Sequence, residues 1–212
     1  MIDKKIVSLS FDDNKIHDIR FSEVLDKFGV KCTFNVNSIS IGRDAHIDKV
    51  FLRELSNRHE IAGHTVSHTQ FLPDQPVEEI RYQVFDDKKA IEDMIGKSIH
   101  GFAYPYGQYS KQMMDIVKES GYSYARTIDN TYGFSFDCDN FYAWHPTCHQ
   151  ENTFKVIDKW QNEDNGLFFI WGHSREFTED WKKLDDLLRR LKDVPNVEYM
   201  TNFDVYSLIN KK

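Results

Sequence analysis

The stretch IVSLSFDD at residues 6–13 carries a mostly apolar run directly into two adjacent carboxylates. Its length and composition predict a buried strand, which would deliver Asp12 and Asp13 together at its C-terminal end. Two like charges side by side in a protein interior are costly unless a cation or a proton compensates them. The stretch therefore predicts a compensating charge beside the end of this strand.

A second polar stretch, HTVSH at residues 64–68, also follows an apolar run. Its two histidines are four residues apart and can lie on one helical face. One Asp and two His make a three-ligand set for a divalent metal with an open position, and the second Asp is then free to act as a base. The alternatives are two unrelated loop histidines, and an aspartate pair that caps a helix or a turn.

Strand-length apolar runs alternate with amphipathic segments along the whole chain. This alternation predicts a parallel sheet with crossover helices, either an open doubly wound sheet or a closed barrel. The predicted strands are Lys5–Phe11, Lys31–Val36, Glu60–Gly63, Gly101–Tyr104, Tyr122–Arg126, Phe141–His145, Leu167–His173 and Val197–Thr201.

Five of the intervening segments have helical spacing. One contains Phe21 to Phe28 and stops at Gly29, a second and weaker one follows Val50, and a third runs from Pro76 to Gly96. A short helix would follow Ser110 and close at Gly121, and a late helix ends before Pro195. The last residues, around Val205, predict a final helix. Residues 127–152 show no period and predict a long loop near a site.

The composition sets bounds on the class of protein. The 212 residues predict a single domain, residues 1–212, with a substantial core. The formal net charge of −7 argues against a nucleic-acid partner, which needs a basic surface. No run is long enough to cross a membrane, the three cysteines are widely spaced, and no leader precedes the first strand. These features favour a cytoplasmic protein, with an oligomeric state that the sequence leaves open.

Further polar residues follow other predicted strands, namely Tyr104-Pro105-Tyr106-Gly107 after the fourth and His173 after the seventh. Sites in barrels and open parallel sheets form at the carboxyl ends of strands, so we expect these segments to converge with Asp12, Asp13 and the two histidines. Cys138, His145, Cys148 and His149 lack a CxxC pair, so a structural zinc site is not expected there.

Taken together and in their order along the chain, the polar segments at the strand ends resemble the motifs of the polysaccharide deacetylase family, the carbohydrate esterases of family 4 with a NodB homology domain. The first family motif, T-F-D-D-G, resembles SFDDN at residues 10–14, and the second, H-[ST]-x-x-H, matches residues 64–68 fully. The third, R-x-P-[YF]-G, resembles AYPYG at residues 103–107, and the fifth, L-x-H, is met at its histidine in WGH at residues 171–173. Ordered motifs of this kind are far more specific than single ones.

The resemblance implies a deformed (β/α)7 barrel and a metal-dependent hydrolase that removes acetyl groups from an N-acetylated sugar. It implies that Asp13, His64 and His68 hold a divalent metal, commonly zinc and sometimes cobalt. Asp12 would be the general base, and His173 the general acid that protonates the leaving amine. The backbone N–H of Tyr106, beside Pro105, would help to stabilise the oxyanion.

Three departures from the family pattern affect this interpretation. The arginine of the third motif, which orients the base, is Ala103 here, and the Asp-rich fourth motif, which tunes the acid histidine, has no clean match. The leucine of the fifth motif is Trp171, which would reshape the acyl pocket. We predict that Arg126, at the end of the fifth strand, replaces the lost arginine, and that His145 reaches the cleft from the long loop.

Three functions stay open on this basis. The first is deacetylation of an N-acetylated saccharide, with Tyr104, Tyr106, Trp144 and Trp171 as possible stacking faces for the sugar. The second keeps the barrel and the metal but hydrolyses another amide, such as a cyclic amide or a formyl group. The third is a carbohydrate-binding relative without catalysis, against which the retention of Asp12, the three ligands and His173 argues.

Overall fold

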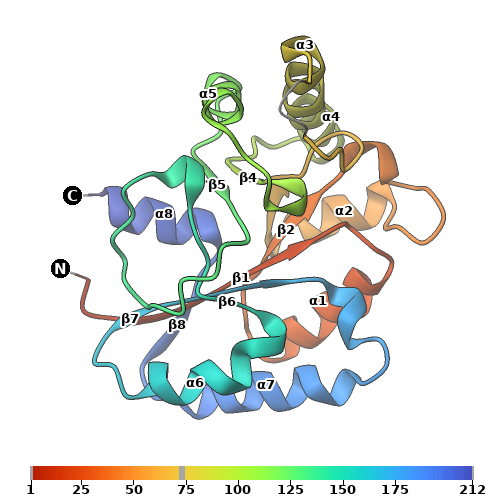
Figure 1. Cartoon of the computed structure of the whole chain (residues 1–212). Coiled ribbons are helices and arrows are strands. Elements are labelled where there is room, and N and C mark those ends of the chain that lie inside the picture. The colour runs from red at the N-terminus through yellow and green to blue at the C-terminus, as the bar shows by residue number, and fades with distance from the viewer. Residues whose placement is uncertain (1, 72–74, 212) are drawn as a thin grey trace.

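The fold is one parallel β-sheet that curls into a half-barrel with helices on its outside (Figure 1). The computed structural model describes residues 2–71 and 75–211. The strand order is β5-β4-β3-β2-β1-β7-β6, and β8 also pairs with β1. The strands are β1 Lys5–Asp12, β2 Thr33–Val36, β3 Glu60–Gly63, β4 Gly101–Ala103, β5 Tyr124–Arg126, β6 Cys148–His149, β7 Gly166–Gly172 and β8 Val197–Tyr199.

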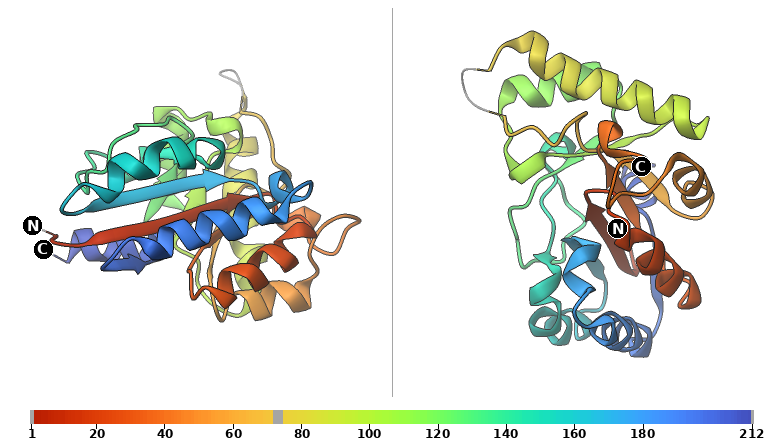
Figure 2. Two further views of the ribbon diagram at one scale, coloured as in Figure 1. Left: turned by 90° about the horizontal axis from the view of Figure 1, so that it is seen from below. Right: turned by 90° about the vertical axis from the view of Figure 1, so that its right-hand side faces the viewer.

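Strand β1 is the centre of this sheet and the source of its distortion. On one side it pairs with β7 over Lys5 to Phe11, and the two strands run together in Figure 2. On its other side it pairs first with β8, over Lys5 to Val7, and then with β2, over Ser10 to Asp12. Because two strands share one flank of β1, the sheet departs from a regular barrel. The predicted deformed barrel is confirmed.

The predicted strand Phe141–His145 is wrong. Residues Phe141–Ala143 form a 3₁₀ helix, η4, which Asn140 begins by accepting a hydrogen bond from Tyr142 N through Oδ1 (3.0 Å). Trp144 then makes a single parallel bridge to Arg126 of β5, and the chain reaches β7 only at the short strand β6. The cap at Asn140 favours a turn over a strand, and among the described residues this segment joins the sheet only through the bridge between Trp144 and Arg126.

Helices cover the outer face of the sheet, with α3, α4 and α5 on one side and α1, α6 and α7 on the other (Figures 1 and 2). Their bounds are α1 His17–Lys27, α2 Lys49–Leu55, α3 Val77–Arg81, α4 Asp87–Ile95, α5 Lys111–Glu119, α6 Thr153–Gln161, α7 Trp181–Asp193 and α8 Asn202–Asn210. Further 3₁₀ helices are η1 Ser38–Ser40, η3 Pro105–Gly107, η5 Gln150–Asn152 and η6 Ser174–Phe177, and η2 Tyr82–Asp86 is a π-helix.

Most of the predicted helices are confirmed with their ends. Gly96 ends α4 in the left-handed conformation, and the Ser110 side chain caps α5 by accepting from Met113 N. Two features were not predicted. Helix α6, which follows the long loop, was missed although its buried residues Val156, Ile157 and Trp160 have helical spacing. The third predicted helix contains the π-helix η2, which joins α3 to α4.

The interior is apolar and holds two of the cysteines. Cys32 and Cys148 are buried, and no disulfide is formed. Among the described residues, no helix is both long and apolar enough to cross a membrane.

Candidate active site

The predicted site segments converge at the carboxyl ends of the strands. Asp12 is the last residue of β1 and Arg126 the last of β5, while His64 directly follows β3 and His173 directly follows β7. Parallel strands bring their C-terminal ends to one edge of the sheet, so these four side chains share that edge.

Asp13, His64 and His68 form a cluster that suits a divalent metal. Their ligand atoms all lie within 4.8 Å of one another. Asp13 Oδ1 is 3.8 Å from His64 Nε2 and 3.4 Å from His68 Nε2. The Nδ1 of His64 lies 2.8 Å from Ala103 O, and the N–H that donates this bond must be on Nδ1, which leaves the Nε2 lone pair for a cation. The donor set fits zinc or a similar ion.

The two histidines lie on a loop and not on the one helical face that their spacing would allow. Thr65 has φ of 69° and His68 has φ of 53°, in the left-handed region, and these two turns fold His68 back toward His64. The imidazole rings are 4.9 Å apart. Backbone turns, and not helical periodicity, therefore bring the two rings together.

Buried polar side chains hold this loop in place. The Asp87 carboxylate accepts hydrogen bonds from Ser38 N (2.9 Å) and from His64 N (3.1 Å). Asn37 Nδ2 donates to His64 O, and Gln83 Oε1 accepts from Ser67 N (3.1 Å). Burial raises the pKa of Asp87 to about 7 against these stabilising bonds. The ligand loop is thus fixed from α4 and η2 on the outer side of the sheet.

Asp12 is buried beside Arg126, as predicted. Arg126 Nη2 donates to both carboxylate oxygens of Asp12, at 2.5 and 2.7 Å, and Nε donates to Ser10 Oγ (3.0 Å). Asn35 Nδ2 donates to Asp12 Oδ1 as well (2.8 Å). Burial alone would raise the pKa of Asp12, but Arg126, His64 and His173 together outweigh it and the pKa falls to about 2. Asp12 is therefore ionised at neutral pH.

Strand register explains how Arg126 reaches this position. Ala103 of β4 and Arg126 of β5 are direct partners in the parallel ladder. Partners in register project to the same face of a sheet, so Arg126 extends into the space over Ala103. Ala103 is fully buried and has no side chain long enough to fill that space.

His173 has a carboxylate partner that the sequence analysis missed. Its Nδ1 lies 2.7 Å from Glu176 Oε1, and Gln150 Nε2 donates to Glu176 Oε2 (2.7 Å). Burial lowers the pKa of His173, but the bond to Glu176 and the nearby Asp12 outweigh it and raise that pKa. Glu176 lies three residues after the histidine on η6, a spacing without a sequence signal of its own.

Arg175 is a second contact that the sequence did not indicate. Its Nη1 donates to Asp13 Oδ2, while half of its side chain stays exposed. The Nε2 of His173 lies 3.9 Å from the same oxygen. Burial raises the pKa of Asp13, and its histidine neighbours outweigh burial, so the pKa is lowered. Asp13 therefore carries a negative charge beside four cationic or basic groups, His64, His68, His173 and Arg175.

Some of the predicted substrate residues lie at this cluster. Tyr106, which follows the buried Pro105, has φ of 57° and is exposed, and its ring lies 4.6 Å from that of His68. Trp171 is half-buried with Nε1 donating to Asn130 Oδ1 (2.8 Å), and the Arg126 guanidinium lies 5.3 Å from its ring. Tyr106 thus lies against the metal-ligand candidate His68, and Trp171 lies against Arg126, the partner of Asp12.

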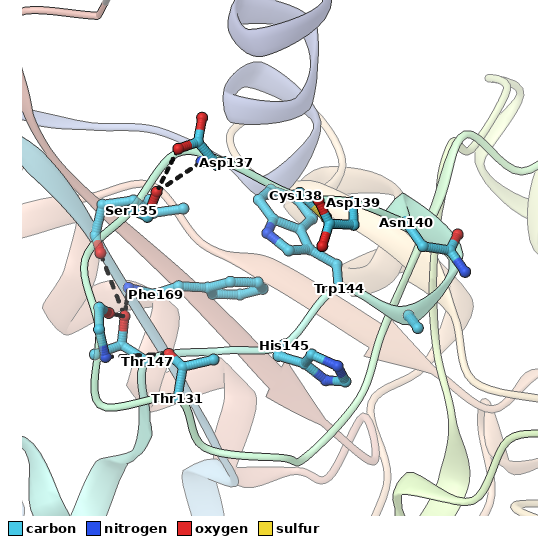
Figure 3. Close-up of a pocket in the computed structure, with 13 residues that line it drawn as sticks. Thr131, Ser135, Asp137, Cys138, Asp139, Asn140, Trp144, His145, Thr147 and Phe169 are labelled. Carbon is cyan, nitrogen blue, oxygen red and sulfur yellow. Dashed lines mark hydrogen bonds between the residues drawn. The ribbon is translucent and has the colours of Figure 1, made fainter.

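The other predicted aromatic residues do not reach it. Trp144 is buried against Tyr124 and Phe169, and it lines a cavity of about 290 Å³ under the long loop (Figure 3). Tyr104 is buried and donates its hydroxyl to Tyr142 O (2.8 Å). His145, which also lines that cavity, is held by Thr127 Oγ1 at 2.7 Å. The sequence pattern could not separate the buried rings of Trp144 and Tyr104 from exposed ones.

Comparisons with known proteins relate the sequence of this chain to polysaccharide and chitooligosaccharide deacetylases. The chain is 25% identical over 128 residues to the putative polysaccharide deacetylase YxkH of Bacillus subtilis, and that match covers 59% of this chain and 46% of the relative. It is 29% identical over 119 residues to a chitooligosaccharide deacetylase of Azorhizobium caulinodans, covering 54% of each. The matches thus span about half the length of these curated relatives.

The fold is similar to a solved structure over nearly its whole length. A family 4 acetyl xylan esterase from Clostridium thermocellum, solved with a cobalt ion, superposes with a TM-score of 0.70 at 22% identity, covering 96% of this chain and 91% of that one. The sequence profile of the polysaccharide deacetylase family matches residues 2–125, more than half of the chain. The chain therefore belongs to the polysaccharide deacetylase family.

Proposed function

We propose that this protein is a metal-dependent hydrolase that removes acetyl groups from an N-acetylated saccharide. The observation that carries the proposal is the buried Asp12–Arg126 pair next to the Asp13, His64 and His68 cluster, with His173 on the other side of Asp13. A base, a metal site and an acid are thereby brought to one edge of the sheet. Family membership and the named substrates of the relatives support an acetylated sugar.

Asp13, His64 and His68 would hold the metal, and zinc fits their donors best. A divalent ion there would polarise the amide carbonyl and make a bound water easier to deprotonate. Asp12 accepts the proton of the attacking water, because Arg126 and Asn35 keep its carboxylate ionised and oriented. The Tyr106 N–H, in its left-handed turn, donates to the oxyanion that forms on the carbonyl oxygen.

His173 completes the reaction by giving a proton to the leaving amine. An amine leaves poorly without that proton, and a histidine supplies it near neutral pH. Glu176 orients the imidazole through Nδ1, so that Nε2 faces Asp13 and the reacting centre. Trp171, where the family has leucine, would form the wall beside the acyl group and set which acyl groups fit.

The test begins with metal-free protein reloaded with one equivalent of Zn²⁺ or Co²⁺. We expect acetate release from N-acetylated chito-oligosaccharides, and a loss of about 100- to 10,000-fold in Asp12→Asn, because a positioned base contributes that much. Asp93→Asn, an exposed aspartate of α4 paired with Lys89, is the matched control and should keep full activity. Metal content and thermal midpoint are measured for each variant, so that loss of the fold is recognised.

Bound metal without acetate release from these sugars would contradict the substrate class. A panel of formyl and cyclic amides would then distinguish a different amidase from a binding protein. Trp171 supports this second candidate function, the hydrolysis of another amide. Its indole stands where the family has the smaller leucine, so the room for the acyl group differs.

A further inference from the structure

A second group of metal-ligating side chains lies directly behind His173. His149 at the end of β6, His173 after β7 and Glu176 on η6 offer ligand atoms that all lie within 4.8 Å of one another. His149 Nε2 is 3.3 Å from Glu176 Oε2, and His173 Nδ1 is 2.7 Å from Glu176 Oε1. All three side chains are at least partly shielded from solvent.

The two nitrogens of His173 face two different clusters. Nε2 is directed at Asp13, 3.9 Å from Oδ2, and Nδ1 is directed at Glu176. The ring thus stands between the cluster of Asp13, His64 and His68 and the cluster of His149 and Glu176. One imidazole can bind a metal through either nitrogen, so its position makes it common to both clusters.

We propose that His149, His173 and Glu176 form a second divalent-metal site, which shares the His173 ring with the proposed catalytic centre. Two imidazole nitrogens and one carboxylate oxygen are the donors preferred by zinc, nickel and copper, whereas magnesium and calcium prefer oxygen alone. The ligands come from the end of β6, the residue after β7 and η6, and Gln150 Nε2 donates to the carboxylate at 2.7 Å.

The surroundings of His149 support its role as a ligand. His149 Nδ1 accepts a hydrogen bond from Glu151 N (3.4 Å), so binding of a metal through Nε2 requires the ring proton to move to Nδ1 and that bond to be given up, with the Glu151 carboxylate 3.6 Å away as the new acceptor. Carboxylate support behind a metal-bound histidine is a common arrangement. The ring of His149 also rests against that of Trp171, with centroids 4.6 Å apart, which limits its rotation. The ring is thus held with Nε2 beside the Glu176 carboxylate.

Occupation of this site would inhibit the proposed reaction. The ion replaces the proton that His173 Nδ1 shares with Glu176, so His173 is held as a neutral ring with its remaining proton on Nε2. A neutral imidazole releases that proton far less readily than an imidazolium, and the leaving amine would stay unprotonated. This consequence rests on the proposed function, whereas the binding of the ion does not.

The test counts Zn²⁺ ions on the full metal-free chain by isothermal titration calorimetry. We expect two binding events in the wild type and one in His149→Phe, which removes the ligand nitrogen but keeps a ring against Trp171. Glu176→Gln, which keeps a polar side chain for Gln150, should lose the same event. His100→Phe is the matched control: its ring stacks on Phe203 at the other end of the sheet, and both events should remain.

Acetate release gives the second readout, as the ratio of rates at one and at ten equivalents of Zn²⁺ within each variant. We expect the wild type to slow by at least about tenfold, in line with the loss of an acid catalyst, and His149→Phe to keep its rate. A single binding event in the wild type, or two events in His149→Phe, would overturn the proposal. Both of those results are obtained without substrate, so a failure of the proposed deacetylation is recognised separately.

Discussion

Arg126 preserves a contact whose usual residue is missing. By resemblance, the family's arginine belongs at position 103, on β4, but alanine stands there and the guanidinium comes from the neighbouring strand. The bond lengths of 2.5 and 2.7 Å to both oxygens of Asp12 mark a charge-assisted pair in a fully buried setting. A single methyl group at Ala103 leaves the space that the longer side chain needs.

Moving the arginine back to β4 tests this exchange. Arg126→Ala should lower kcat for acetate release by about 10- to 100-fold, because Asp12 loses the group that orients it. It should also destabilise the fold by about 3–5 kcal/mol, since a buried carboxylate is left unpaired. The double variant Ala103→Arg/Arg126→Ala should recover part of both losses. Steady-state kinetics and denaturant unfolding measure the two effects, and a double variant no better than the single one would contradict the exchange.

At the scale of elements, the π-helix η2 connects the outer helix layer to the metal-ligand loop. It places the Gln83 side chain against Ser67, and the Gln83 backbone carbonyl accepts a hydrogen bond from Val66 N (3.1 Å). Asp87, the first residue of α4, bonds His64 N from the same side. π-Helical turns are frequent at functional sites, and here the turn serves to position a loop.

Removing the acceptor at Asp87 tests this connection. The two carboxylate oxygens of Asp87 accept hydrogen bonds from Ser38 N and His64 N. In Asp87→Asn an NH₂ group replaces one of these oxygens and faces a backbone N–H, so one of the two bonds is lost. We expect the affinity for Zn²⁺ to fall by about 10- to 100-fold, measured by competition with a chelator. The neighbouring exposed Asp86→Asn is the control and should bind as the wild type does. Equal affinities in the two variants would show that the loop is positioned by other contacts.

The sequence predicted the elements that have strong local signals and missed those that depend on tertiary packing. Seven of the predicted strands and the strand-end position of Asp12, His64 and His173 are confirmed, because apolar runs and caps decide them locally. The approach of Arg126 to Asp12 was predicted from the end of β5. Glu176 was not, because a glutamate in a 3₁₀ turn becomes a histidine partner only through the packing of η6 against β6. The burial of Trp144 also depends on tertiary packing, because it follows from the bridge that this residue makes to Arg126 of β5.

At the scale of the whole molecule, buried polar groups lie at both ends of the sheet, but they differ between the two ends. The carboxyl end holds the site, while the opposite end is closed by the first turn of α8. Glu60 there accepts from Tyr124 Oη (2.7 Å), Thr33 Oγ1 (2.7 Å) and Phe203 N (3.0 Å). Burial nonetheless outweighs these bonds and raises the pKa of Glu60 to about 7. A carboxyl group is therefore protonated more readily in the folded chain than in the unfolded one.

This shift predicts a pH dependence of stability with a definite sign. Because the folded pKa lies above the unfolded one, the contribution of Glu60 is fully present below about pH 4.5 and is lost as the pH rises through about 7. The full shift corresponds to about 3 kcal/mol, and partial exposure of the side chain should reduce it. Glu60→Gln, which cannot ionise, should gain stability relative to the wild type between pH 5 and pH 8 in urea unfolding. A constant difference between the two across this range would contradict the prediction.

The pairing of Ala103 with Arg126 also has a consequence for how relatives of this chain should vary. The space above Asp12 holds one guanidinium, which β5 supplies here and which, by resemblance, β4 supplies in the family. In an alignment of relatives, we expect positions 103 and 126 to vary together: where one carries arginine, the other carries a small residue. A motif search that inspects only position 103 would then classify relatives with the arginine at position 126 as degenerate although they are active. The evolutionary route between the two arrangements would pass through a sequence carrying both arginines or neither.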